Sequence, residues 1–298
     1  MSVRTPPVTI GLPVYNGERF LTDALASILG QTFEDFLLVV SDNASTDRTV
    51  DIVEEHATRD ERIMFLRSDV NRGAAWNYNR VFGECRTPYF KWAAADDMLA
   101  PTYLERLLAT LDTSPPNVVL AYPHTQLVDA DGAVVGEFVD ELAAQPGAPP
   151  FVRVHRVASK IALGNVIFAL MRADALARTR LHGNYPAADY VLLAELALVG
   201  EFRVVPEPLF RRRLHEGISS RANPTKASLT HWFDTQRAPV RSPGLNLLRE
   251  YLAGIQYARL PRSQRLLAGL LVTETWARRQ TGLRTRMRAL VRRLLRST

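Results

Sequence analysis

Two adjacent carboxylates, Asp96 and Asp97, follow a run of aromatic and small apolar residues that begins at Tyr89. Such a run is typical of a buried strand, and the pair would lie at its carboxyl end, where open α/β sheets hold ligands. Two neighbouring acids are hard to keep ionised together without a cation beside them, and hard divalent ions prefer oxygen ligands. The pair therefore indicates a metal site, although a helix cap or a solvated turn would use the same residues.

Strand and helix patterns alternate along the chain before these acids. Apolar runs predict strands over 8–14, 36–40 and 63–66, and helical spacing predicts helices over 18–29 and after the second and third strands. This order predicts an α/β protein with a mostly parallel sheet, flanked by helices, whose loops meet at one edge. The polar residues of these loops are Tyr15, Asn16, Asp42, Asn43, Asp47, Asn71, Arg72, Asp96 and Asp97. Turn chemistry explains any one of them, but their convergence indicates a ligand site.

Several classes of protein are disfavoured by the same sequence. Neither the glycine pattern of dinucleotide-binding Rossmann proteins nor that of P-loop NTPases is present in the 298 residues. The single cysteine, Cys85, allows no internal disulfide, and no apolar run near the amino terminus resembles a signal peptide. These features predict a cytoplasmic protein with an ordinary globular core.

The net charge of +6 is unevenly distributed along the chain. Residues 259–298 hold eleven arginines and one acid, whereas the remainder has a net charge of −4. From Leu283, apolar residues recur at helical spacing among arginines, which predicts a basic amphipathic helix. Such a helix either packs on the fold or attaches the protein peripherally to an anionic inner membrane surface. The acidic body argues against a nucleic-acid partner.

Four ordered blocks carry a family resemblance: Pro13-Val14-Tyr15-Asn16, Asp42-Asn43-Ala44-Ser45-Thr46-Asp47, Asn71-Arg72-Gly73 and Asp96-Asp97. They resemble the blocks of family 2 glycosyltransferases with the GT-A fold, over roughly the first 125 residues. The resemblance implies a Rossmann-like, mostly parallel sheet and an inverting, hexosyltransferase-type enzyme of cell-envelope polysaccharide synthesis. It further implies a nucleotide-diphosphate sugar as donor, a glycan, lipid-linked or small-molecule hydroxyl as acceptor, and Mn²⁺ or Mg²⁺ as cofactor.

The resemblance also implies roles for single residues. Asp96 and Asp97 would hold the metal, with Asp97 foremost, because Ala94 stands where many members have a further acid. The donor-binding residues would be Pro13, Tyr15, Asn16, Asp42, Asn71, Arg72, Asp96, Arg211 and His215. Asp189, just before an apolar helix at 191–198, resembles the catalytic base, although aspartate is also a favoured helix cap. Glu195, farther along that helix, is a weaker candidate.

The rest of the chain completes the expected architecture. Patterns predict helices over 101–111 and 154–163, strands over 118–128 and 166–171, a hairpin turn at 129–132, and a basic loop around 211–220. We expect a donor-binding half at 1–128, an acceptor-facing half at 129–222 and a helical basic extension at 223–298. Two other functions stay open at this point. A nucleotidyltransferase would release pyrophosphate, and a catalytically silent protein would bind sugar nucleotides without transfer.

Overall fold

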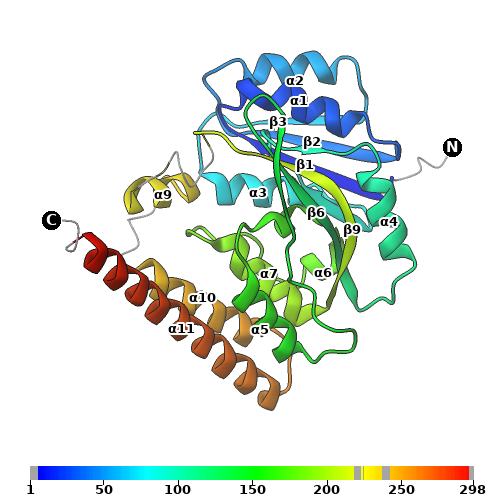
Figure 1. The fold of residues 1–298 in the computed structure, drawn as a ribbon. Helices are drawn as coiled ribbons and strands as arrows, with labels where there is room; N and C mark the ends of the chain where they lie inside the picture. Colours follow the sequence, from blue (N-terminus) through cyan, green and yellow to red (C-terminus); the bar gives the residue numbers. More distant parts are fainter. Residues whose placement is uncertain (1–5, 218–222, 224, 237–241, 295–298) are drawn as a thin grey trace.

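A computed structural model describes residues 6–217, 223, 225–236 and 242–294, with residues 226 and 281–294 described through their backbone alone. Within these residues, nine strands form one sheet in the order β3-β2-β1-β4-β8-β6-β9-β5, with β7 beside β6 (Figure 1). The strands are β1 Val8–Val14, β2 Phe36–Asp42, β3 Ile63–Arg67, β4 Tyr89–Trp92, β5 Met98–Leu99, β6 Val118–Val128, β7 Val134–Phe138, β8 Leu170–Arg172 and β9 Glu201–Arg213.

The first four strands are parallel and form the half of the sheet that the alternating pattern predicted. Helices α1 (Glu18–Leu29), α2 (Thr49–Ala57) and α4 (Tyr103–Asp112) contribute to the hydrophobic core on one face, and α3 (Ala74–Gly83) covers the other (Figure 1). Close packing of α3 requires a glycine in β1, because a Cβ at Gly11 would lie 2.6 Å from Val81 Cγ2. The carboxyl ends of these strands therefore meet at one edge, as expected for a parallel sheet.

The second half of the sheet is mixed. Strand β8 is antiparallel to β4 and β6, whereas β6 and β9 are parallel to each other. Helices α5 (Pro150–Lys160) and α7 (Ala188–Val199) cover the α3 face here, and α6 (Ala173–Leu176) follows β8. A mostly parallel sheet flanked by helices, expected from the sequence, is thus confirmed.

Two predicted elements differ from the structure. The strand predicted over 166–171 is a 3₁₀ turn, η1 (Asn165–Phe168), followed by the short strand β8. The N–H groups of Ile167 and Ala169 donate to the carbonyls of Gly164 and Val166, so these residues form a turn, and pairing with β4 and β6 is left to residues 170–172. The start of the predicted basic loop, Arg211 to Arg213, lies in β9, because pairing with β6 continues to Arg213.

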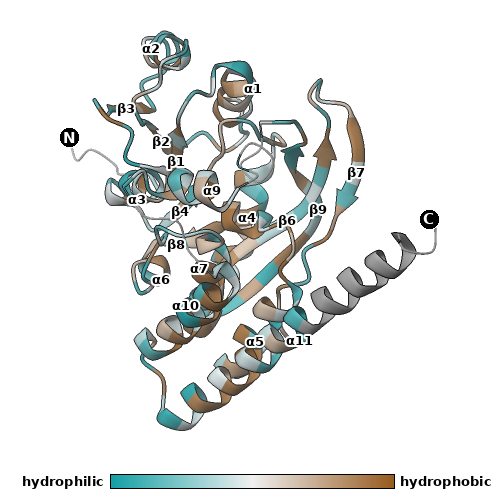
Figure 2. Cartoon of the chain, turned by 90° about the vertical axis from the view of Figure 1, so that its left-hand side faces the viewer, coloured by the Kyte–Doolittle hydropathy of each residue, from teal (hydrophilic) through white to brown (hydrophobic). Residues whose placement is uncertain are grey.

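The extension that follows is helical, as predicted. It comprises α9 (Lys226–Phe233), α10 (Pro243–Tyr257) and α11 (Arg262–Leu294). Figure 2 shows α11 beside α5, with α10 packed against α11 and α7, and Ala268 and Val272 of α11 are buried. Helix α11 begins at Arg262, well before the amphipathic helix predicted from Leu283. The side chains of that predicted amphipathic stripe lie outside the described residues. Among the described helices, none has the length and apolarity needed to cross a membrane.

Candidate active site

The loops after β1 and β2 are tied together by Asn16. Its backbone N–H donates to Ser45 Oγ at 2.8 Å, and its side-chain Oδ1 accepts from the N–H of Thr46 at 2.8 Å. Asn16 has a φ of 50°, in the left-handed region where asparagine is better tolerated than most residues. Beside it, Pro13 is buried in β1 and Tyr15 is 46% exposed at the sheet edge. Of these predicted donor contacts, Tyr15 and Asn16 are exposed, whereas Pro13 is buried.

Asp42 and Asn43, at the end of β2, organise the adjoining loops. The Asp42 carboxylate is buried and accepts from the N–H groups of Ala44 and Ser45 at 3.1 and 3.2 Å. Asn43 Nδ2 donates to Asn71 Oδ1 at 3.0 Å, and Asn43 Oδ1 accepts from the Arg72 N–H at 3.0 Å. The loops after β2 and β3 are therefore fixed to each other before any ligand binds.

Arg72 is exposed, and its guanidinium lies 5.0 Å from the ring centre of Trp76. In this position the Arg72 guanidinium can bind an anionic ligand while it remains stacked on the Trp76 ring. Below this edge, Asn77 Nδ2 donates to the carbonyls of Val14 and Ser41, and so joins β1 to β2. The structure thus brings the predicted residues of three loops to one surface.

The end of β9 holds the Asp96-Asp97 turn in place. The backbone N–H of Arg213 donates to Asp97 Oδ1 at 2.9 Å, and its guanidinium donates to the Asp96 carbonyl at 3.1 Å. His215 Nε2 lies 2.9 Å from Asp96 Oδ2, and the His215 ring packs against Phe20. The sequence placed Asp96, Asp97 and His215 in one site, and the structure brings all three together.

Asp97 is buried, and its surroundings oppose ionisation. Burial and the neighbouring charge of Asp96 raise the pKa of the Asp97 carboxyl, whereas the Arg213 N–H and the charges of Arg212 and Lys91 lower it. A divalent cation beside the two acids would reverse this balance, because its charge favours both carboxylates. The site is therefore electrostatically incomplete with protein groups alone.

Two charged neighbours of Asp97 were not singled out from the sequence. Lys91 is fully buried in β4, where its Nζ donates to the Trp92 carbonyl at 2.8 Å. Burial lowers the pKa of Lys91, and the charge of Asp97 opposes that shift. Arg213 is 2% exposed and also binds Asp23 Oδ2 at 2.9 Å. A lysine inside an apolar strand was a readable signal, whereas nothing local distinguished Arg213 from Arg211 or Arg212.

Arg211 and Arg212 lie on opposite faces of β9, because side chains alternate along a strand. Arg211 is exposed and its Nε lies 3.3 Å from Gln126 Oε1 on β6. Arg212 instead donates to the Leu163 carbonyl at 2.7 Å and to Asn165 Oδ1. Of the two, Arg212 is the arginine whose charge acts on Asp97 and Asp189.

Asp189 lies in the first turn of α7, one residue after the helix begins at Ala188. The helix cap is Ala187, so Asp189 is not the cap residue that its position before the apolar run indicated. Burial raises the pKa of Asp189 to about 6, against donation from the Tyr190 and Asp189 N–H groups and the charge of Arg212. A carboxylate with this pKa is ionised at neutral pH and remains basic enough to accept a proton.

Glu195, the weaker candidate, has a structural partner. Its carboxylate is buried and accepts from Arg180 Nε at 2.5 Å and from the Arg180 N–H at 2.7 Å. Arg180 in turn pairs with Glu250 of α10 at 3.0 Å. This network joins α7 to the carboxy-terminal helices, and it leaves Asp189 as the better placed base.

The side chains of the site can be compared with the ligands that a metal ion needs. Within the described part of the chain, no group of three or more His, Cys, Asp or Glu side chains is placed to hold a metal ion. Asp96 and Asp97 nevertheless supply carboxylate oxygens beside an imidazole, which suit Mn²⁺ or Mg²⁺. The residues fit a cation that takes its remaining ligands from a bound diphosphate or from water.

Comparisons with known proteins agree with this geometry. A model of the family Glycosyl transferase family 2 matches residues 9–177. An uncharacterized glycosyltransferase of Haemophilus influenzae is 26% identical over 216 residues, which cover 70% of this chain and 66% of that protein. Chondroitin synthase of Escherichia coli is 26% identical over 214 residues, which cover 71% of this chain and 29% of that protein. The chain thus matches less than two thirds of the length of either relative.

Solved structures share the fold. S. aureus TarS 1-349 in complex with UDP-GlcNAc aligns with a TM-score of 0.67 at 16% identity, covering 90% of this chain and 72% of that chain. Mannosyltransferase PcManGT from Pyrobaculum calidifontis, in complex with GDP-Man and Mn2+, aligns with a TM-score of 0.55 at 16% identity, covering 97% and 81% of the two chains. These likenesses confirm the expected GT-A fold. Because the family model also matches more than half of its residues, this chain belongs to glycosyl transferase family 2.

Proposed function

We propose that this protein is an inverting glycosyltransferase that moves a hexose from a nucleotide-diphosphate sugar to a hydroxyl of a glycan or lipid-linked acceptor. The observation that carries the proposal is the Asp96-Asp97 turn, which β9 fixes beside the joined loops of β1, β2 and β3. Family membership supports transferase chemistry, and the UDP-GlcNAc and GDP-Man complexes of the two structural neighbours support a nucleotide-sugar donor. The similarity to chondroitin synthase supports a polysaccharide product.

The donor would bind along the sheet edge. Tyr15 is exposed where a base can stack, with Asp42 and the loop of Asn71 behind it, and Arg72 is placed to meet phosphate oxygens. Arg211, exposed on β9, stays a proposed donor contact. Asp96 and Asp97 would hold a divalent cation together with the diphosphate, a proposal that the Mn2+ in the PcManGT complex supports. When bound, that cation offsets the negative charge that grows on the leaving nucleotide.

Asp189 would act as the general base. Its pKa of about 6 lies close to neutral pH, so the carboxylate can take the proton of an acceptor hydroxyl as that oxygen attacks the anomeric carbon. One displacement of this kind inverts the anomeric configuration, through a transition state that resembles an oxocarbenium ion. Arg213 and His215 keep the opposite wall of the site in place, because they bind Asp97 and Asp96 directly.

Calorimetry and kinetics on two variants test these assignments. UDP, dTDP and GDP sugars are titrated into the protein with and without Mn²⁺, and transfer is followed as release of the nucleoside diphosphate. We expect Asp97→Ala to lose both metal-dependent donor binding and turnover, and Asp189→Asn to bind donor normally and lose transfer. Equal donor affinity and equal activity in the two variants would contradict the roles assigned here.

Adding nucleoside triphosphates and a range of acceptors to this experiment separates the rival functions. Release of pyrophosphate from a nucleoside triphosphate would identify a nucleotidyltransferase, and donor binding without transfer to any acceptor would identify a silent sugar-nucleotide-binding protein. The cytoplasmic location, the peripheral membrane attachment through the residues from 283 onward, the lack of a nucleic-acid partner and the domain boundaries at 128 and 222 stay predictions.

A further inference from the structure

The segment between α5 and η1 contacts both Asp189 and Arg212. Tyr190, next to Asp189, donates from its hydroxyl to the Ala162 carbonyl, and Arg212 donates to the Leu163 carbonyl at 2.7 Å. Arg212 also donates to the side chain of Asn165, whose Nδ2 donates to Thr125 Oγ1 at 3.2 Å. We name residues 162–165 the support loop. It connects the first turn of α7 to the end of β9.

Gly164 lies in the middle of the support loop and against the proposed base. A Cβ at this position would lie 2.5 Å from Asp189 Oδ2, and the Gly164 φ of 72° is unfavourable for other residues. The backbone of the support loop therefore forms the wall on which the Asp189 carboxylate rests. Because Arg212 binds the residues on both sides of Gly164, it fixes that wall.

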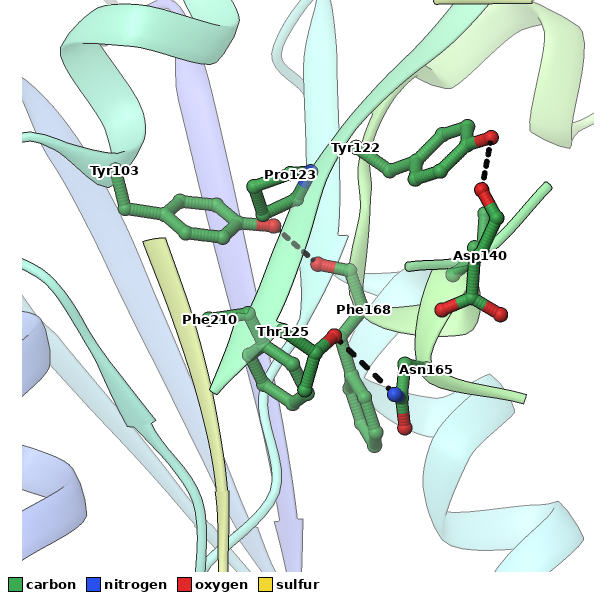
Figure 3. A pocket seen from close by; sticks show the side chains of 9 residues that line it. Tyr103, Tyr122, Pro123, Thr125, Asp140, Asn165, Phe168 and Phe210 are labelled. Carbon is green, nitrogen blue, oxygen red and sulfur yellow. Dashed lines mark hydrogen bonds between the residues drawn. The ribbon is translucent and has the colours of Figure 1, made fainter. Parts of the chain in front are cut away.

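A second carboxylate shares the charge of Arg212. Asp140 is 3% exposed, and neither of its carboxylate oxygens has a hydrogen-bond partner among the described residues. Figure 3 shows Asp140 near Asn165, with the Tyr122 hydroxyl bonded to its backbone carbonyl rather than to its carboxylate. Burial raises the pKa of Asp140 to about 6, and the charge of Arg212 opposes this rise. Arg212 thus acts as counter-charge to Asp140 and Asp189, in addition to Asp97.

The other titratable groups around Asp189 stay uncharged at neutral pH. They are Tyr190 on its own helix, Tyr78 on α3 and Tyr251 on α10, and burial raises the pKa of each phenol. Arg279 of α11 acts on Tyr190 and Tyr251, and its guanidinium donates to the carbonyls of Ser159 and Ile161. The cation whose charge acts on Asp189 itself is Arg212.

We propose that Arg212 is a positioning residue for the reaction, which holds the support loop against Asp189 and divides its charge between Asp189 and Asp140. This inference rests on the proposed role of Asp189 as base. It assigns two separable effects to one side chain. The hydrogen bonds of Arg212 place the carboxylate, and its charge sets the pH at which the carboxylate ionises. Asp140 competes for that charge, so its removal strengthens the effect on Asp189.

The test measures ionisation of Asp189 without relying on activity. Urea unfolding free energies are determined from pH 5 to 8 for pairs of proteins that differ only by Asp189→Asn, in the wild-type, Arg212→Gln, Arg212→Lys and Asp140→Asn backgrounds. The pH dependence of each difference reports the pKa of Asp189 in that background. The midpoint of this pH dependence is the quantity compared. We expect Arg212→Gln to move the midpoint upward by about one pH unit, Arg212→Lys to leave it near the wild-type value, and Asp140→Asn to move it downward.

Kinetics on the same proteins separates placement from charge. With UDP-GlcNAc or GDP-mannose and Mn²⁺, Arg212→Lys should lower kcat at unchanged donor affinity. Lysine keeps the charge, but its side chain is shorter, so its ammonium would not reach the two acceptors that one Arg212 nitrogen binds. Arg203→Gln, on the same strand and paired with Glu201, is the matched control and should change neither the midpoint nor kcat. An unchanged midpoint in both Arg212→Gln and Asp140→Asn would overturn the inference. Full transfer by Asp189→Asn, with the midpoints shifted as expected, would instead refute the base assignment alone.

Discussion

Replacing Asp140 by asparagine should stabilise the protein at neutral pH. The Asp140 carboxylate is buried without a hydrogen-bond partner among the described residues, and burial raises its pKa from an ordinary 3.8 to about 6. A carboxyl with a raised pKa in the folded state binds its proton more tightly there than in the unfolded chain. The contribution of this group to the unfolding free energy is therefore most favourable below about pH 4. That contribution is lost as the pH rises through about 6.

The size of the effect follows from the shift. A rise from 3.8 to about 6 corresponds to about 3 kcal/mol of unfolding free energy, at 1.36 kcal/mol per unit. Of this, about 1.4 kcal/mol develops between pH 5 and pH 8, a range in which the protein is expected to stay folded. Asparagine has nearly the same shape and no charge, so the stability of Asp140→Asn relative to wild type should rise by this amount across the range.

Urea unfolding followed by tryptophan fluorescence at pH 5, 6, 7 and 8 measures this difference. Asp131→Asn is a suitable control, because Asp131 is exposed in the turn before β7 and its replacement should give a difference that is small and independent of pH. A difference for Asp140→Asn that is flat with pH, or that falls as the pH rises, would refute the reasoning. Either result would mean that the folded protein stabilises the Asp140 carboxylate, through a direct ion pair with Arg212 for example.

Two further predictions concern helix α7, which carries the proposed base Asp189, and the groups packed against it. Gly164→Ala should destabilise the protein by about 1 to 2 kcal/mol in thermal unfolding, because alanine is strained at positive φ and its Cβ would meet Asp189 Oδ2. The same variant should lower kcat more than donor affinity, and unchanged kinetics would show that the support loop does not position Asp189. Glu195→Ala should cost about 3 kcal/mol, because it leaves the partly buried Arg180 without one of its two partners. If its donor affinity also fell sharply, Glu195 would not be the purely structural group described above.

Much of the donor side of the site could be predicted from the sequence, because its signals are local. The strand bounds at Val8–Val14 and the helix at Glu18–Leu29 agree with the structure to the residue, since each follows from a continuous apolar pattern. Asp42 ends β2, and Asn71 and Asp96 lie in the loops after β3 and β4, all within the parallel half of the sheet. Their convergence therefore follows once the alternation of strands and helices is recognised. For these residues, position along the chain is enough to fix position in space.

Other parts of the candidate site depend on contacts between segments that are distant in the sequence. The N–H of Arg213 reaches Asp97 across 116 positions in sequence, and nothing near either residue indicates that contact. Three consecutive arginines in β9 have three different surroundings, since strand alternation and burial send Arg211 to solvent, Arg212 to the support loop and Arg213 beneath the acids.

The sequence alone determined the residue types, their order, and the family whose blocks they resemble. Only the tertiary structure decided which acids are buried, because burial and charge depend on the elements packed around a side chain rather than on its neighbours in the chain. In the sequence, nothing distinguishes Asp140, and Asp189 stands out only through the family resemblance and its place before an apolar helix. The packing of β9, the support loop and α7 gives both carboxyls a pKa of about 6 and places one arginine within reach of both.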